Sequence, residues 1–229
     1  MQVVLFCDKI DLVINMRIRN VKNKESILGN SKHLVVDAEK YIGKWSQLFN
    51  NDNPIYIEIG MGKGKFIREM ARTYPNINFI GIEKYDSIIA KCLPKIDDDV
   101  SNLVVVRMNA LNIDKVFSKE IDCIYLNFSD PWPKVRHHFR RLTSNIFLEK
   151  YDKIFKDKKS IYMRTDNQDL FIYSLESFSK HNYYLHNISF DLHKNCDDDI
   201  ITTEYEDKFS AKNMPIYFVY ASSEKDIEV

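Results

Sequence analysis

The sequence lacks long apolar runs and has few cysteines. Its four cysteines, Cys7, Cys92, Cys123 and Cys196, are scattered and form no C-x-x-C pair. We therefore expect neither a disulfide framework nor a zinc or other metal site, which suits a reducing cytoplasm. No apolar segment approaches the roughly 18 residues that a membrane span needs. The mildly apolar stretch Gln2–Asn15 is interrupted by charges and is followed by no small-residue cleavage site, so we expect no signal peptide.

The chain also has no net charge, because 33 basic residues balance 33 acidic ones. Many nucleic-acid binders of this size are basic overall, so a case for an RNA partner must rest on local clusters. The sequence contains no repeats or low-complexity tracts, and its 229 residues are 45% hydrophobic, enough for a packed core. We interpret residues 1–15 as a possible N-terminal extension and residues 16–229 as a single domain.

Short β-branched or aromatic runs alternate with segments of helical periodicity. Helical spacing is found around residues 66–71, 86–96, 146–155 and 170–178. The expected strands between them are 55–59, 78–82, 103–107, 121–127 and 160–165. Residues 183–189 and 215–221 resemble an antiparallel pair with a long insertion between its strands. This order predicts a doubly wound α/β domain whose sheet is mainly parallel, with one antiparallel strand near the C-terminus.

A glycine-rich loop follows the first of these strands. Gly60, Gly62 and Gly64 stand in a G-x-G-x-G spacing between strand and helix, which allows a tight turn and close approach of a ligand to the backbone. The dinucleotide spacing is G-x-G-x-x-G, so a pyrophosphate ligand is disfavoured. Glu58, beside the loop, suits a positively charged ligand group such as the amino end or sulfonium of S-adenosylmethionine.

Two more polar residues end the next two strands. Glu83 can accept hydrogen bonds from both ribose hydroxyls of a nucleoside, and Asn109 could reach its adenine. Strand ends of a parallel sheet meet in one crevice, so these residues predict a nucleoside cofactor. S-adenosylmethionine is favoured over NAD.

The fourth strand leads into Asp130-Pro131-Trp132-Pro133. The two prolines predict a stiff, extended turn that holds the acid over the crevice. The next eight residues, Lys134–Arg141, carry four fixed positive charges, an aromatic residue and two histidines. Such a cluster beside an active site indicates contact with a phosphate backbone, the alternative being a solvated helix face.

Four motifs in order resemble the bacterial tRNA (guanine-N7)-methyltransferase family over nearly everything from Met16 onward. They are IEIGMGKGKFI at Ile57–Ile67, YLNFSDPWPK-x-RHHFRRLT at Tyr125–Thr143, RTDN at Arg164–Asn167 and TEYEDKFSA at Thr203–Ala211. The resemblance implies a Rossmann-like methyltransferase fold and methyl transfer from S-adenosylmethionine to N7 of guanine 46 in the tRNA variable loop. The family includes monomers and homodimers, and no protein partner is indicated.

The resemblance also assigns site residues. Glu58, Glu83, Asn109 and Asp130 would line the cofactor site, and Asp130 would be the catalytic acid. The substrate nucleotide would contact Lys134, Asp166, Thr203, Glu204, Tyr205 and Glu206. The RNA would contact Arg136, His137, His138, Phe139, Arg140 and Arg141. From the residues alone, the segment from Thr203 to Glu206 is a polar surface loop with a helix-capping threonine.

The chemistry of guanine N7 limits what these residues must do. N7 carries a lone pair and no proton, so methyl transfer needs in-line placement rather than a general base. A nearby carboxylate would stabilise the positive charge that develops on the purine. We expect Asp130 or Asp166 to bind the N1–H and N2–H₂ edge of guanine and thereby exclude adenine. Lys134 could hold a phosphate or the O6 edge.

Three other functions remain open from the sequence. Methyltransferases of exocyclic amines carry an acid–proline–proline–aromatic turn after the fourth strand, and the order Asp-Pro-Trp-Pro departs from it. An NAD-dependent oxidoreductase would bind nicotinamide and ignore S-adenosylmethionine. An RNA-binding module on an inactive scaffold would bind tRNA without transferring a methyl group.

Overall fold

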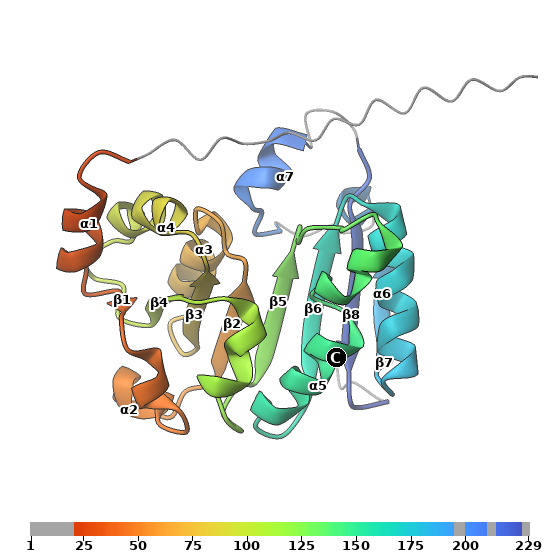
Figure 1. Cartoon of the computed structure of the whole chain (residues 1–229), viewed down its shortest axis with the longest axis horizontal. Helices are drawn as coiled ribbons and strands as arrows, with labels where there is room; N and C mark the ends of the chain where they lie inside the picture. The colour runs from red at the N-terminus through yellow and green to blue at the C-terminus, as the bar shows by residue number, and fades with distance from the viewer. Residues whose placement is uncertain (1–20, 195–199, 210–213, 226–229) are drawn as a thin grey trace, which may run out of the picture.

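A computed structural model describes residues 21–194, 200–209 and 214–225 (Figure 1). The possible extension at residues 1–15 lies outside this range, as do Cys7 and Cys196. Cys92 and Cys123 are buried free thiols. None of the helices in the described ranges is long and apolar enough to cross a membrane.

The described residues form one sheet with the strand order β1-β4-β3-β2-β5-β6-β8-β7. Its strands are β1 (Leu34–Val35), β2 (Ile55–Ile59), β3 (Asn78–Glu83), β4 (Leu103–Arg107), β5 (Cys123–Asn127), β6 (Ser160–Thr165), β7 (Tyr184–Ser189) and β8 (Tyr217–Ser222). β8 runs antiparallel to both of its neighbours, β6 and β7, and the remaining pairs are parallel. The predicted fold class and the antiparallel C-terminal pair are therefore confirmed.

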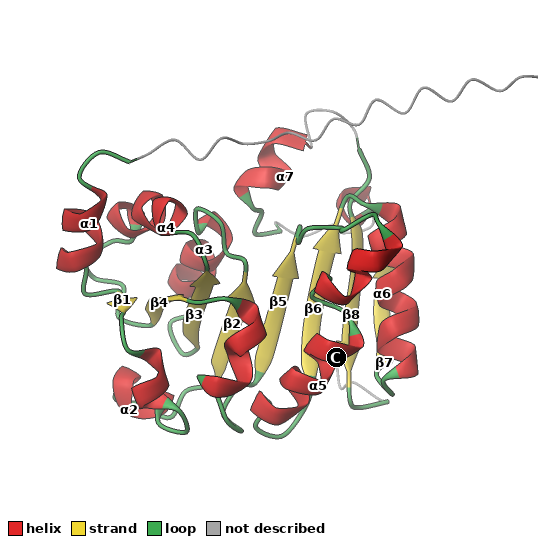
Figure 2. Cartoon of the chain, viewed as in Figure 1, coloured by secondary structure: helices red, strands yellow, loops and turns green. Residues whose placement is uncertain are grey.

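Helices cover the sheet on both faces (Figure 2). Residues of α3 and α4 pack with alternate residues of the central strands, such as Phe79 and Val105, in one buried cluster. Residues of α5 and α6 pack with the intervening ones, such as Ile80 and Val106, in another. These helices are α3 (Lys65–Thr73), α4 (Asp86–Cys92), α5 (Asn145–Ile154) and α6 (Gln168–Lys180). Strands buried on both faces explain the continuous apolar runs that marked them in the sequence.

The structure adds elements between residues 24 and 49, where no periodic pattern predicted a helix or strand. They are α1 (Lys24–Asn30), β1, the 3-10 helix η1 (Ala38–Tyr41) and α2 (Trp45–Phe49). Trp45 is fully buried, its indole donates to the carbonyl of Val116 at 3.0 Å, and its ring packs on Phe117. Elements this short are held by such tertiary contacts more than by their own propensity.

The predicted helix over residues 86–96 is wrong in its last turn. α4 ends at Cys92, and a 3-10 helix η2 (Leu93–Lys95) continues it. Pro94 lies within that turn, and proline cannot donate the backbone hydrogen bond that an α-helix requires. The remaining 3-10 helices are η3 (Ala110–Lys115), η4 (Val135–Arg140) and η5 (Leu192–Lys194).

Candidate active site

The glycine loop turns the chain sharply from β2 into α3. The amides of Gly60 and Met61 both donate to the carbonyl of Ile82 on the neighbouring strand, at 2.8 and 3.0 Å. Gly64 has φ 74°, and a Cβ there would collide with the thiol of Cys92 on α4. Glycine is therefore required at this position for conformation and for the close approach of two helices.

Glu58 lies under this loop and is only 2% exposed. Its Oε1 accepts a hydrogen bond from Asn127 Nδ2 at 2.9 Å, whereas Oε2 has no hydrogen-bond partner among the described residues. Burial raises the pKa of this carboxyl to about 8, and the neighbouring Glu204 and Glu206 add to the rise. A buried acceptor without a donor fits a cationic or hydrogen-bonding ligand group, such as the amino group of S-adenosylmethionine.

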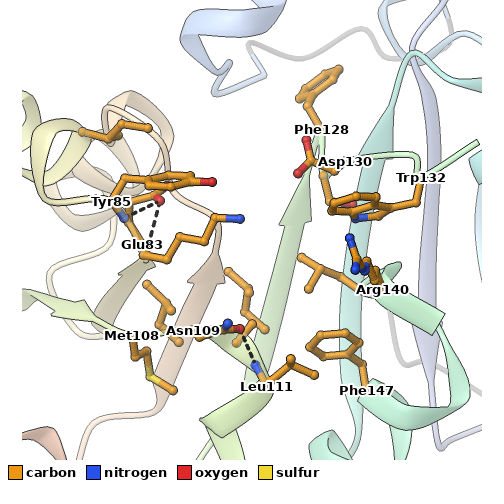
Figure 3. A pocket seen from close by; sticks show the side chains of 18 of the residues that line it. Glu83, Tyr85, Met108, Asn109, Leu111, Phe128, Asp130, Trp132, Arg140 and Phe147 are labelled. Carbon is orange, nitrogen blue, oxygen red and sulfur yellow. Dashed lines mark hydrogen bonds between the residues drawn. The ribbon is translucent and has the colours of Figure 1, made fainter. Parts of the chain in front are cut away.

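Glu83 and Asn109 are fixed by bonds to the backbone beside them (Figure 3). Glu83 Oε1 accepts from the amides of Lys84 and Tyr85 at 2.7 and 3.0 Å, while burial raises the pKa of its carboxyl. Asn109 Oδ1 accepts from the amide of Leu111 at 3.0 Å and so caps η3. Side chains held in this way present a fixed orientation to a nucleoside.

A cleft of about 590 Å³ joins the carboxyl ends of β2, β3 and β4 to the turn after β5. Four predicted cofactor residues line it: Gly60, Glu83, Asn109 and Asp130. The other lining residues are Ile59, Ile82, Lys84, Tyr85, Ile88, Met108, Ala110, Leu111, Phe128, Ser129, Trp132, Phe139, Arg140, Leu142 and Phe147. The other predicted site residues lie outside this lining, namely Glu58, Gly62, Gly64, Lys134, Arg136, His137, His138, Arg141, Asp166, Thr203, Glu204, Tyr205 and Glu206.

The turn that carries Asp130 is tighter than predicted. Trp132 has φ 43° and Phe128 has φ 50°, both in the left-handed region, so the expectation of an extended backbone is wrong at Trp132. Non-glycine residues in this region store backbone strain that surrounding contacts must offset. The guanidinium of Arg141 supplies such contacts, because its Nε donates to the carbonyl of Pro131 at 2.8 Å and its Nη2 to that of Trp132 at 3.4 Å.

The basic run Lys134–Arg141 divides into an exposed part and a buried end. η4 places Lys134, Arg136 and Arg140 at the surface, and the guanidinium of Arg140 lies 4.9 Å from the centre of the Trp132 ring (Figure 3). Burial and the surrounding positive charges lower the pKa of His137. Arg141 is only 3% exposed, so the structure gives it a place inside the turn rather than on the surface.

The segment after Ile201 is a helix, α7 (Glu204–Phe209), and the expectation of a surface loop is wrong. The threonine was correctly expected to cap a helix. Thr203 Oγ1 accepts from the amide of Glu206 at 3.0 Å, and Glu206 Oε2 accepts from the amide of Thr203 at 2.8 Å. This reciprocal pair is a capping box, whose T-x-x-E pattern is visible in the sequence.

α7 lies beyond the carboxyl ends of β5 and β6 (Figure 1). It contacts the segments that follow these two strands and also the start of α3. Its Tyr205 donates to Asp166 Oδ2 at 3.0 Å and packs its ring on Phe128 at 4.8 Å. Its Glu204 accepts from the amide of Lys65 at 3.2 Å, at the start of α3. Asp166, Tyr205 and Phe128 therefore form one cluster at the rim of the cleft.

Sequence reasoning missed two polar residues that support this site. Asn127 holds Glu58, and Arg164 donates to the carbonyl of Ile201 at 2.7 Å and lies 3.5 Å from the carboxylate of Glu206. Asn127 is the last residue of one predicted strand and Arg164 is the penultimate residue of another. Polar side chains at such positions are typical of a ligand-binding edge.

The sheet order, the glycine loop after β2 and the acids at the ends of β2 and β3 define a Rossmann-like, S-adenosylmethionine-dependent methyltransferase. A family model described as "Putative methyltransferase" matches residues 52–219. A tRNA (guanine-N(7)-)-methyltransferase of Geobacillus sp. (strain WCH70) is 49% identical over 205 residues, which cover 88% of this chain and 93% of that protein. That of Oceanobacillus iheyensis is 47% identical over 92% of this chain and 100% of its own length. The chain belongs to this family of methyltransferases.

Solved structures show the same fold in more distant proteins. The crystal structure of the 16S rRNA methyltransferase KamB superimposes with a TM-score of 0.59 at 11% identity, over 79% of this chain and 91% of that one. An antibiotic-related methyltransferase superimposes with a TM-score of 0.57 at 18% identity, over 79% and 92%.

Proposed function

We propose that this enzyme transfers a methyl group from S-adenosylmethionine to N7 of guanine 46 in the variable loop of tRNA. The proposal rests chiefly on one observation: a single cleft joins Glu83 and Asn109, the candidate nucleoside-binding residues, to Asp130. The names of its relatives give the substrate class. Because the proposed substrate is tRNA, we also propose a cytoplasmic location.

S-adenosylmethionine supplies an electrophilic methyl group on a sulfonium. Glu83 would accept the ribose hydroxyls, and Asn109 would contact the adenine from the neighbouring strand end. Gly60 lets the backbone approach the cofactor closely, and Gly62 and Gly64 shape the same turn. Glu58 would hold the amino end through its unpartnered Oε2.

The catalytic work of the chain is orientation and charge stabilisation. Asp130 is exposed on the cleft and needs to take no proton, because N7 has none. Its carboxylate would stabilise the positive charge that grows on the purine, and Asp166 would accept the N1–H and N2–H₂ donors of guanine. Thr203 and Glu206, which the family resemblance also assigns to the substrate, would act by forming the start of α7 that presents Glu204 and Tyr205.

The exposed part of the basic run would bind the tRNA backbone. Arg136 and Arg140 lie on η4, beside the mouth of the cleft that Phe139 and Arg140 help to line. Lys134 directly precedes η4, and His137 and His138 lie within it. Positive charge on this surface favours contact with phosphates. We assign Arg141 a positioning role in the Asp130 turn, because its guanidinium is buried on backbone carbonyls.

Isosteric variants of the two aspartates test this division of roles. Asp130→Asn should lower kcat by roughly a hundredfold, the loss typical of one electrostatic stabiliser. Asp166→Asn should raise KM for tRNA by roughly tenfold. It should also reduce the ratio of activity on a transcript with G46 to activity on one with A46. Asp157→Asn, which changes an exposed acid in the turn before β6, is the matched control and should behave as wild type. Wild-type rates and base choice in both site variants would contradict the proposal.

A further inference from the structure

The helix α7 has six residues, too few to be stable on its own propensity, so its contacts must fix its position. Those on one side are the Tyr205–Asp166 hydrogen bond and the packing of Tyr205 on Phe128. In the middle of the helix, Glu206 lies 3.5 Å from Arg164 and 3.6 Å from His193. On the other side α7 contacts Lys65, the first residue of α3 and the direct neighbour of Gly64 in the cofactor loop.

Lys65 contacts α7 through both its backbone and its side chain. Its ammonium donates to Thr202 Oγ1 at 2.7 Å and to both carboxylate oxygens of Asp207, at 2.8 and 2.7 Å. Its amide donates to Glu204 Oε2 at 3.2 Å. Gly64 has no side chain with which to cap α3, so the carboxylate of Glu204 satisfies one of the free amides at the start of that helix.

The charges in this contact are paired. The hydrogen bonds from Lys65 and Thr202 hold the pKa of Asp207 below its usual range, so Asp207 is ionised at neutral pH. Glu69, one turn along α3, lies 4.0 Å from the same ammonium. An ammonium that already faces two carboxylates is a weak ligand for a tRNA phosphate, and its geometry suits a fixed contact within the protein.

We propose that Lys65 is a positioning residue that couples the cofactor loop to the substrate helix. By holding Thr202 and Asp207 it fixes α7, and α7 in turn sets Tyr205 and Asp166 at the rim where guanine enters. The inference rests on the proposed function. It adds that one residue adjoining the cofactor loop determines how well the guanine pocket is formed.

Two single variants with opposite changes of charge test this idea. Lys65→Met and Asp207→Asn should each raise KM for tRNA by roughly three- to tenfold. The expected effect is moderate because the two side chains are 22% and 44% exposed, so solvent partly screens the ion pair. The dissociation constant for S-adenosylmethionine without tRNA should change less than about twofold. The double variant should be no worse than either single one, because both remove the same contact.

Two control variants, and the direction in which Asp207→Asn changes KM for tRNA, separate positioning from other effects. Lys65→Arg keeps a cation able to pair with Asp207 and should recover most of the loss, which also shows that the site still folds. Arg72→Met removes an ion pair with Asp97 at the other end of α3 and should leave KM for tRNA at the wild-type value. If Lys65 merely attracted RNA, Asp207→Asn would lower KM while Lys65→Met raised it.

Opposite effects of the two single variants, or wild-type KM in both, would overturn the inference. A failure of the proposed function itself would be seen separately, as a wild-type enzyme that does not methylate the tRNA.

Discussion

The buried carboxyl of Glu58 makes cofactor affinity depend on pH in a way that can be calculated. Burial raises its pKa to about 8, so at pH 7 about a tenth of the ligand-free protein carries it ionised. If Oε2 receives the cationic amino group of S-adenosylmethionine, the bound form requires the ionised carboxylate. Binding then releases a proton, and the apparent dissociation constant must fall as pH rises toward 8.

The size of the effect follows from that pKa. For a single group titrating at 8, the dissociation constant falls about ninefold from pH 6 to pH 7 and about 25-fold from pH 6 to pH 7.5. The window ends at 7.5 because an α-amino group loses its own charge near pH 8. Burial raises the pKa of Glu83 as well, so a matched variant must isolate the contribution of Glu58.

Isothermal titration calorimetry in buffers of different ionisation enthalpy measures both the affinity and the proton released. Glu58→Gln keeps the size of the side chain and the acceptor for Asn127 but cannot titrate. It should bind weakly at every pH and lose most of the slope between pH 6 and 7.5. A wild-type dissociation constant that changes by less than about threefold over this window would refute the reasoning, as would the same slope in Glu58→Gln.

Four further single substitutions have expected outcomes. Glu83→Gln should weaken cofactor binding by roughly 1–3 kcal/mol, since the variant loses a charged acceptor for two hydroxyls, and calorimetry measures this loss directly. Arg141→Lys should lower kcat while leaving the salt dependence of tRNA binding unchanged. Arg136→Ala should have little effect on kcat but should reduce by about one the slope of log binding constant against log salt concentration. The opposite pattern would contradict the roles assigned. Gly64→Ala should lower the free energy of unfolding by roughly 1–3 kcal/mol in chemical denaturation, and adding Cys92→Ala should restore part of it, with no recovery refuting the steric explanation.

The same titration of Glu58 also affects the stability of the ligand-free protein. Its pKa is about 8 in the folded chain against an ordinary value of 4.5, so between these values the folded state holds more protons than the unfolded state. Stability therefore falls as pH rises through this window, by at most about 1.4 kcal/mol per pH unit from this group. Thermal denaturation of wild type and Glu58→Gln would show the difference between them narrowing at low pH.

The strands, and the positions of the candidate cofactor residues at their ends, could be predicted from the sequence because their signals are local. A run such as IYIEI is buried on both faces, Glu58 lies within it, and Glu83 ends the next strand. The parallel order then brings strand ends together at one edge, so Gly60, Glu83, Asn109 and Asp130 meet in one cleft as expected.

What the sequence did not predict depends on contacts between distant segments. Nothing near Arg141 in the sequence indicates that its guanidinium turns inward onto the carbonyls of Pro131 and Trp132. The contact between Lys65 and Asp207 joins residues 142 positions apart. The start of α7 was an exception, because its capping box is readable, but a helix so short has no periodicity to extend the signal.

The most direct test of the account is to map the methylated atom. The purified enzyme is incubated with labelled S-adenosylmethionine and unmodified tRNA transcripts, which are then reduced and treated with aniline. Methylation of N7 makes the chain break at that nucleotide, so the account predicts incorporation of label and a break at guanine 46. Label without a break would indicate an exocyclic amine as the target, and tRNA binding without label would indicate an inactive scaffold; either result would contradict the proposed function.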